Sequence, residues 1–173
     1  MPEGGGARGG APAGGRGAVT ALAVRLTGPA DLGAVTRYES DPGAAGWLGV
    51  KGLAWHERAL ADPDQEHLLA EVDGEPAGFV VLAGLRETAG TVELRRIVVG
   101  PAFQGRGLGR RMFRTAVARA HGLHGAHRVW LDVKPGNVRA RALYTSEGFI
   151  ENGTIAGPPE DPEDLILMIH DAR

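Results

Sequence analysis

The segment that decides the fold of this chain is VELRRIVVGPAFQGRGLGRRM, which runs from Val92 to Met112. Its first half is apolar and β-branched and ends at Gly100-Pro101, as a strand does before a turn. A turn rich in glycine and arginine follows, and apolar residues then recur at helical spacing. The first amides of a helix have no partner within it, and the helix dipole makes that end positive. The segment therefore predicts a strand, a turn and a helix that bind an anionic phosphate group.

The composition of the turn supports a phosphate ligand. Gly105, Gly107 and Gly109 let the backbone approach a ligand closely, because glycine has no Cβ. Arg106 and Arg110-Arg111 add positive potential. A nucleotide P-loop would end in Gly-Lys-Ser/Thr, and a dinucleotide fingerprint would read Gly-x-Gly-x-x-Gly, so neither motif fits this turn.

The residues before the turn predict an antiparallel meander. Apolar segments at His67–Val72, Pro76–Leu85 and Thr91–Val99 are joined by the hairpin signal Asp73-Gly74 and by a turn at Thr88–Gly90. Short links of this kind connect neighbouring antiparallel strands.

Further elements are expected on both sides of this meander. Upstream we expect a strand over 21–26, a helix from Pro29 to about Ser40, a chain break at Asp41-Pro42-Gly43 and a helix over 50–61. Downstream the helix after the glycine turn ends near Gly122. A strand over 127–133, a short helix capped by Asn137 and closed near Gly148, and strands over 149–155 and 165–170 complete the pattern.

Together these elements predict an α/β sandwich. Its sheet is mixed and mostly antiparallel, with six to seven strands flanked by about four helices.

Composition narrows the class of protein. The chain has 173 residues, enough for one domain over 19–173, and residues 1–18 have the composition of a disordered tail. A net charge of −2 gives no electrostatic case for nucleic-acid binding. The chain has no cysteine, so disulfides and a cysteine nucleophile are excluded. It has neither an apolar run of about 20 residues nor a signal-peptide core, so we expect a cytoplasmic protein without membrane contact.

Two blocks resemble the GNAT superfamily of N-acetyltransferases. Gln104-Gly-Arg-Gly107-Leu-Gly109 resembles the Gln/Arg-x-x-Gly-x-Gly/Ala loop of that superfamily. Asn137-x-x-Ala140-x-x-Leu143-Tyr144-x-x-x-Gly148-Phe149 resembles its second recurrent block. One helix and one strand separate the two blocks, as the superfamily requires, and the order of elements agrees over roughly residues 19–170.

The resemblance implies acetyl-CoA as cosubstrate and a GNAT-like sandwich. The strand before the turn would carry a bulge and lie beside the pantetheine arm, and the turn amides would hold the pyrophosphate. Asn137 would contact the arm as well as cap its helix. The implied cofactor-binding residues are Ile97, Val98, Val99, Gln104, Gly105, Arg106, Gly107, Leu108, Gly109, Arg110 and Asn137.

The resemblance also implies an acid and a base. Tyr144 matches the tyrosine that protonates the departing CoA thiolate in many members, although a buried aromatic is the alternative. A base must deprotonate the amine before it attacks. Glu93 is the first candidate base, Glu39 the second and Asp132 the third. Direct transfer to the amine, without a covalent enzyme intermediate, is the family expectation.

The acceptor side is less defined by the sequence. The implied acceptor is a primary amine of a small molecule, a polyamine, a protein N-terminus or a lysine. Trp47, Trp55 and His56 lie where such folds cover the acceptor, and the acidic turn 160–164 would favour a cation, although a solvated loop is the alternative. We expect no metal site, since His121, His124 and His127 are interpreted as solvated loop residues. A non-catalytic acyl-CoA sensor is the alternative function, and a homodimer is a family-level expectation.

Overall fold

Seven strands form one sheet in the computed structural model, which describes residues 21–86 and 89–172. The strands are ordered β1-β2-β3-β4-β5-β7-β6, and every neighbouring pair is antiparallel except β4 and β5. The predicted α/β sandwich with a mixed, mostly antiparallel sheet is therefore confirmed. The strand bounds are β1 Leu22–Leu26, β2 Gln65–Val72, β3 Glu75–Ala83, β4 Thr91–Val99, β5 Arg128–Val133, β6 Ile150–Ile155 and β7 Leu165–Asp171.

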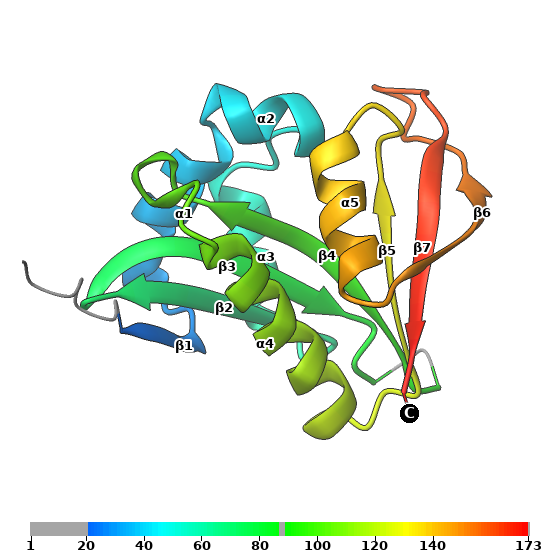
Figure 1. Ribbon diagram of the computed structural model, residues 1–173. Coiled ribbons are helices and arrows are strands. Elements are labelled where there is room, and N and C mark those ends of the chain that lie inside the picture. Colours follow the sequence, from blue (N-terminus) through cyan, green and yellow to red (C-terminus); the bar gives the residue numbers. More distant parts are fainter. Residues whose placement is uncertain (1–20, 87–88, 173) are drawn as a thin grey trace, which may run out of the picture.

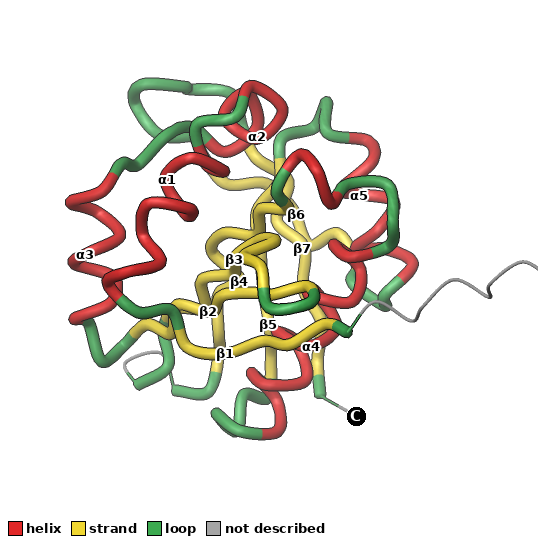
Figure 2. Tube along the Cα trace, turned by 90° about the vertical axis from the view of Figure 1, so that its left-hand side faces the viewer, coloured by secondary structure: helices red, strands yellow, loops and turns green. Residues whose placement is uncertain are grey.

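Helices cover both faces of this sheet (Figures 1 and 2). The helices α1 (Leu32–Glu39) and α3 (Leu53–Ala61) pack on one face, and α4 (Leu108–Gly122) and α5 (Val138–Ser146) lie on the other. The short helix α2 (Pro42–Leu48) lies near the end of α5. No helix among the described residues is both long and apolar enough to cross a membrane.

Two hydrophobic cores hold the layers together, one on each face of the sheet. Strand β3 contributes to both, because alternate side chains of a strand point to opposite faces. Val80 and Leu82 join the core under α4, and Phe79 and Val81 join the core under α1 and α3. The apolar stripe predicted for the helix after the glycine turn is confirmed, since these residues are buried: Leu108, Met112, Phe113, Ala116 and Ala120.

Strand β4 carries a bulge that changes which side chains face each core. Val81 pairs with Arg96 and Leu82 pairs with Leu94, so Arg95 is an extra residue on β4. Before the bulge, Leu94 faces the α4 core; after it, Val98 faces the opposite core. The bulge implied by the resemblance is present.

Beyond this bulge β4 and β5 separate. Their parallel pairing covers only Thr91–Glu93 on β4 and Arg128–Trp130 on β5. Figure 1 shows the two strands diverging toward the end of the molecule that carries α2 and α5. The edge of β4 that faced β5 is thus not paired with that strand after Glu93, and the site is built there.

The predicted break after the first helix is present, because α1 ends at Glu39, but Pro42 and Gly43 also begin α2, which was not predicted. The Asp41 side chain accepts a hydrogen bond from the Gly43 amide, and Pro42 occupies the first helical position. The helix expected over 50–61 begins instead at Leu53. The hairpin at Asp73-Gly74 is confirmed. The tail 1–18 and Thr88 of the predicted turn lie outside the described residues.

Candidate active site

Two adjoining cavities occupy the opening between β4 and β5. The first, of about 530 Å³, is called the loop cavity, and its lining includes the turn after β4 and one side of α5. The second, of about 500 Å³, is called the strand cavity, and its lining includes β4, β5 and the segment after α2. Trp47 and Asn137 line both cavities. A ligand that spans the two would therefore pass these two side chains.

The loop cavity contains most of the predicted phosphate-binding turn. Gly105 and Gly107 adopt positive φ angles of 75° and 73°, which other L-residues rarely adopt. Gly107 stands at the N-cap of α4, so the first amides of that helix open toward this turn without an intrahelical partner. Gly109 has another role, because a Cβ there would lie 3.4 Å from Val99. This glycine lets α4 pack closely on β4.

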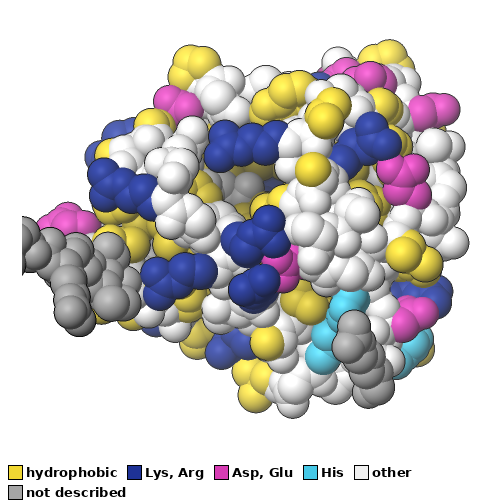
Figure 3. All heavy atoms as spheres, viewed as in Figure 1, with side chains coloured by type: hydrophobic (Ala, Val, Ile, Leu, Met, Phe, Trp, Pro, Cys, Tyr) yellow, Lys and Arg dark blue, Asp and Glu magenta, His cyan; other side chains and the backbone are white. Residues whose placement is uncertain are grey.

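Basic side chains surround this turn unevenly. Arg110 and Arg139 line the loop cavity, and Figure 3 shows lysine and arginine side chains around a hollow on this face. Arg110 donates to Ser146 at 2.8 Å and forms an ion pair with Glu147. Arg106 is exposed and is not part of the lining, and its contact with the cofactor stays a prediction.

Strand β4 presents alternate side chains to the loop cavity. Ile97 and Val99 line it, as predicted. The side chain of Val98 is 3% exposed and packs in the core on the opposite face, so a ligand in this cavity would meet its backbone. The expectation that Val98 lies beside the cofactor's arm stays a prediction. Gln104 lines the cavity and donates through Nε2 to the Val99 carbonyl at 3.2 Å.

Asn137 acts as a helix cap at the junction of the cavities. Its Oδ1 accepts a hydrogen bond of 3.2 Å from the Ala140 amide, which confirms the predicted cap. On the same helix, Ala140 and Leu143 line the loop cavity. These two residues were not predicted as site residues, although their spacing of three and six from Asn137 would place them along one side of a helix. Phe103 and Ser146 were missed as well, and no motif marks them.

Among the titratable groups that line the strand cavity are the predicted acid and two candidate bases, from three elements: Glu93 on β4, Asp132 on β5 and Tyr144 on α5. Glu93 accepts from Arg95 through Nη2 at 2.6 Å and Nε at 2.8 Å. Asp132 forms no hydrogen bond or ion pair with a side chain of the described residues. Asp132 is exposed by its accessible surface, yet the surrounding protein still desolvates the carboxylate and raises its pKa; the charge of Glu93 raises it further, and Arg95 partly opposes this.

Tyr144 is buried, and it still reaches the cavity. Its ring stacks on Phe113 at 5.0 Å between centroids, as expected for an aromatic on the apolar side of α5. Burial raises the pKa of its phenol to about 12, and the negative charge of Asp132 contributes to the rise. The phenol therefore stays protonated at neutral pH.

Glu39 is not part of either cavity. It is 1% exposed and forms an ion pair of 2.8 Å with Arg96. Burial alone would raise its pKa, but contacts with His56, the Gly52 amide and Arg96 outweigh burial and lower it to about 2. A carboxylate with so low a pKa and no access to the cavity is a poor base, so the interpretation of Glu39 as a base is wrong.

Other expected features of the acceptor side have mixed outcomes. Trp47 and Trp55 line the strand cavity, whereas His56 is buried beneath it. From the acidic turn, Glu160 and Asp161 also line the cavity, and Asp161 forms an ion pair with Lys134. The histidines expected in a solvated loop have partners: His121 lies 3.0 Å from His170, and His124 lies 3.1 Å from Glu66.

Residues 34–149 match the sequence model of the acetyltransferase (GNAT) family. The chain belongs to this family. It is an acetyl-CoA-dependent N-acetyltransferase, and the resemblance inferred from its two blocks is confirmed. This GNAT chain is 35% identical over 130 residues to the N-alpha-acetyltransferase RimI of Mycobacterium tuberculosis, covering 71% of this chain and 80% of that protein. It is 29% identical over 150 residues to a putative [ribosomal protein bS18]-alanine N-acetyltransferase of Bacillus subtilis, and the match covers 86% of this chain and 95% of that protein.

Solved structures share the GNAT fold. The spermidine N-acetyltransferase from Vibrio cholerae, in complex with CoA and spermine, superposes with a TM-score of 0.76 at 19% identity. The superposition covers 87% of this chain and 95% of that one. At this identity the likeness concerns the fold alone.

Proposed function

We propose that this GNAT enzyme transfers the acetyl group of acetyl-CoA to a primary amine at the junction of the two cavities. The observation that carries the proposal is the pair of cavities that meet at Trp47 and Asn137. One contains a turn suited to phosphate, and the other contains the carboxylates of Glu93 and Asp132 and the phenol of Tyr144. Donor and acceptor would therefore approach each other from opposite sides of the opening between β4 and β5.

The loop cavity fits the donor. Free amides at the start of α4 and the side chain of Arg110 suit the pyrophosphate, because a helix N-terminus favours anions. The open edge of β4 beside Ile97 and Val99 suits an extended amide chain, which can pair with a strand edge. Asn137 would contact that chain at the junction. Acetyl-CoA supplies the activated acetyl carbon, and the protein supplies its orientation.

A carboxylate in the strand cavity would prepare the acceptor. An ammonium has no lone pair, so it must lose a proton before it attacks the acetyl carbon. Glu93 and Asp132 both line the cavity, but Arg95 holds Glu93 through two hydrogen bonds. Asp132 has a raised pKa and therefore a higher proton affinity. These differences favour Asp132 as the base and assign to Glu93 the role of raising the pKa of Asp132.

Tyr144 would serve as the acid. When the amine attacks, the thiolate of CoA leaves and needs a proton. The Tyr144 phenol is protonated at neutral pH and lines the same cavity as Asp132. The carboxylate then takes a proton from the amine, and the phenol gives a proton to the thiolate of CoA. The amine attacks the acetyl carbon directly, so no covalent enzyme intermediate is required.

The α-amine of a protein N-terminus is the acceptor we propose first. The relative from Mycobacterium tuberculosis, whose name states Nα-acetylation, is 35% identical and is covered over 80% of its length. The cavity lining holds as many basic as acidic side chains, but Arg95, Arg96 and Lys134 are each paired with a carboxylate, which leaves Asp132 and Glu160 to receive a cationic group. Its volume of about 500 Å³ accommodates the first residues of a peptide.

The experiment is a thiol-release assay with acetyl-CoA and four acceptors: an alanine-initiated peptide, an Nα-blocked lysine, spermidine and an aminoglycoside. Mass spectrometry of the products identifies the acetylated nitrogen. We expect the peptide to give the highest kcat/KM. Turnover confined to another acceptor would overturn the choice of acceptor. If CoA binds and no acceptor turns over, the non-catalytic acyl-CoA sensor is the better account.

A further inference from the structure

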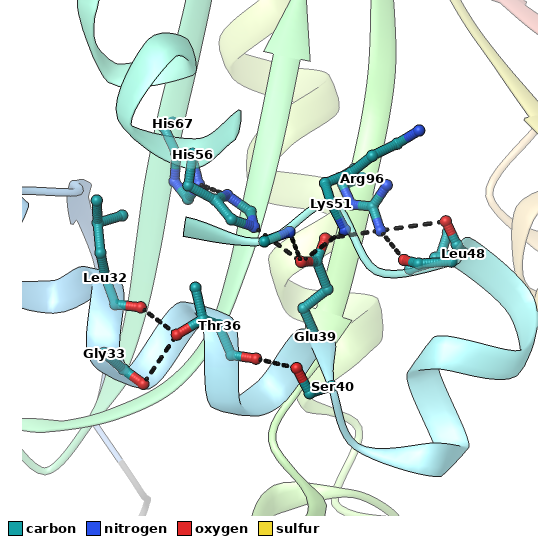
Figure 4. Close-up of polar contacts among 12 residues, drawn as sticks. Leu32, Gly33, Thr36, Glu39, Ser40, Leu48, Lys51, His56, His67 and Arg96 are labelled. Carbon is teal, nitrogen blue, oxygen red and sulfur yellow. Dashed lines mark hydrogen bonds and ion pairs between the residues drawn. The ribbon is translucent and has the colours of Figure 1, made fainter. Parts of the chain in front are cut away.

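A buried polar network lies behind the strand cavity, on the face covered by α1 and α3 (Figure 4). Its members are almost inaccessible to solvent: Glu39 is 1% exposed, His56 0%, His67 3% and Arg96 4%. Burying charges costs free energy unless they are paired and hydrogen-bonded. None of these four groups has a part in the proton transfers described above. Their partners show what they hold.

Glu39 and Arg96 both bind the backbone of one segment, residues 48–52. Glu39 Oε2 accepts hydrogen bonds of 3.0 Å from the amides of Lys51 and of Gly52. Arg96 Nη2 donates to the carbonyls of Leu48, at 3.2 Å, and Gly49. The two side chains also contact each other, with Arg96 Nη2 2.8 Å from Glu39 Oε1. One ion pair therefore holds both ends of a five-residue segment.

This segment is a wall of the strand cavity. Leu48, Gly49, Val50 and Lys51 line it, and Arg96 lines it as well. Arg96 belongs to β4, three residues after Glu93. The Trp55 ring, also in the lining, lies 5.7 Å from the Arg96 guanidinium carbon. The ion pair thus connects the wall to the strand that carries one of the two carboxylates.

Two histidines fix the orientation of Glu39 from behind. His56 Nε2 lies 3.2 Å from Glu39 Oε2, and His56 Nδ1 lies 3.0 Å from His67 Nε2. His67 Nδ1 in turn lies 2.9 Å from the Thr27 hydroxyl. When His56 donates from Nε2 to the carboxylate, its Nδ1 accepts from His67 Nε2, and His67 Nδ1 accepts from the Thr27 hydroxyl. All three donors of this row then point toward Glu39. This row of rings leaves the Glu39 carboxylate little freedom to turn away from the wall.

We propose that Glu39 and Arg96 are positioning residues for the acceptor: together they fix the wall formed by residues 48–52 relative to Glu93 and Asp132. The inference rests on the proposed function, because it assigns the strand cavity to the acceptor. Neither residue takes part in bond making. Their loss would let the wall move and would weaken acceptor binding, while the loop cavity, on the other side of the opening, keeps its affinity for CoA.

Glu39→Gln and Arg96→Lys test the proposal in the full chain. Glutamine keeps the size of Glu39 but lacks its charge. Lysine lacks the branched guanidinium group of arginine, so its single ammonium cannot contact Glu39, Leu48 and Gly49 at once. For the best acceptor of the panel, we expect KM to rise about tenfold while kcat changes less than about threefold. The Kd for CoA stays unchanged. Glu71→Gln is the matched control, since it breaks an ion pair with Arg25 on β1, outside both cavities.

The alternative is a purely structural role, which has a different kinetic signature. A variant that only loses folded protein shows a lower kcat at unchanged KM. The proposal would be overturned if KM for the acceptor is unchanged in both variants, whether or not kcat falls. It would also be overturned if the Kd for CoA rises as much as that KM. Arg96→Lys decides the question alone if Glu39→Gln does not fold.

Hydrogen exchange separates this proposal from the proposed function. In Glu39→Gln the amides of Lys51 and Gly52 should exchange faster than in Glu71→Gln, and unchanged exchange would overturn the inference without any assay of activity. If the wild-type enzyme acetylates no amine, the proposed function fails, and exchange at these two amides still decides whether Glu39 holds the wall.

Discussion

Asp132 on β5 and Tyr144 on α5 line the same cavity, and the charge of the carboxylate helps to keep the phenol protonated. Burial is the larger cause of the raised pKa of Tyr144, and desolvation by the surrounding protein also raises the pKa of Asp132. Two groups with raised pKa values in one cavity suit opposite tasks: a carboxylate with higher proton affinity accepts a proton more readily, and a phenol that never ionises near neutral pH can donate one. This relationship leads to the first two predictions.

Tyr144→Phe should lower kcat about 100-fold with little change in the KM of either substrate, because a general acid acts in the transition state. The ring still stacks on Phe113, so thermal unfolding should hardly change. Tyr38→Phe is the control, since that hydroxyl donates to the Pro76 carbonyl outside both cavities. A Tyr144→Phe variant as active as Tyr38→Phe would show that water or another group protonates the thiolate.

The carboxylates are distinguished by the pH dependence of kcat/KM. Glu93→Gln removes the charge that raises the pKa of Asp132, so the acidic limb of the profile should move to lower pH. Asp132→Asn should reduce kcat/KM about 100-fold near neutral pH and recover partly at high pH, where more of the amine is already neutral. The opposite pattern, with Asp132→Asn active and Glu93→Gln inactive, would make Glu93 the base.

Gly107→Ala tests the phosphate-binding turn. The positive φ of 73° costs an alanine about 1 kcal/mol, so the turn should relax and the Kd for CoA should rise roughly tenfold. Gly122→Ala, at the last residue of α4 with open space around it, should leave the Kd unchanged. Isothermal titration with CoA measures both. Equal affinities in the two variants would indicate that the turn does not hold the phosphates.

The buried histidine makes stability depend on pH. Burial, and then the neighbouring His56, lower the pKa of His67 from 6.5 to about 4, so between these values the unfolded chain binds more protons than the folded one. The contribution of His67 to the free energy of unfolding is therefore fully present above pH 6.5, and it is lost as the pH falls toward 4, by up to about 3 kcal/mol.

Urea unfolding between pH 7 and pH 4.5 measures this slope. His67→Gln should flatten it, whereas His127→Gln, at an exposed histidine, should retain it. An identical slope in wild-type and His67→Gln would assign the effect to another group.

The sequence predicts those parts of the molecule that depend on local patterns. The meander follows from alternating apolar segments and Asp73-Gly74, the helix cap from Asn137, and the turn before α4 from Gly105 and Gly107, whose backbone geometry suits glycine. Each of these signals lies within a few residues of the feature that it predicts. For this reason the predicted feature is found in the folded chain.

The parts that were missed depend on contacts between distant residues. Glu39 resembles an accessible carboxylate at the end of a helix, and only the fold reveals that Arg96, 57 positions later, pairs with it. Helix α2 was missed because the sequence Asp41-Pro42-Gly43 is typical both of a turn and of the start of a helix.

The proposed acid role of Tyr144 is tested most directly by single-turnover acetyl transfer to an alanine-initiated peptide, measured for the wild-type enzyme and Tyr144→Phe, with mass spectrometry of the product. We expect one acetyl group on the α-nitrogen and a chemical step about 100-fold slower in the variant, at equal affinity for CoA. Acetyl transfer that is absent from the wild-type enzyme, or that proceeds at the same rate in both proteins, would contradict this expectation.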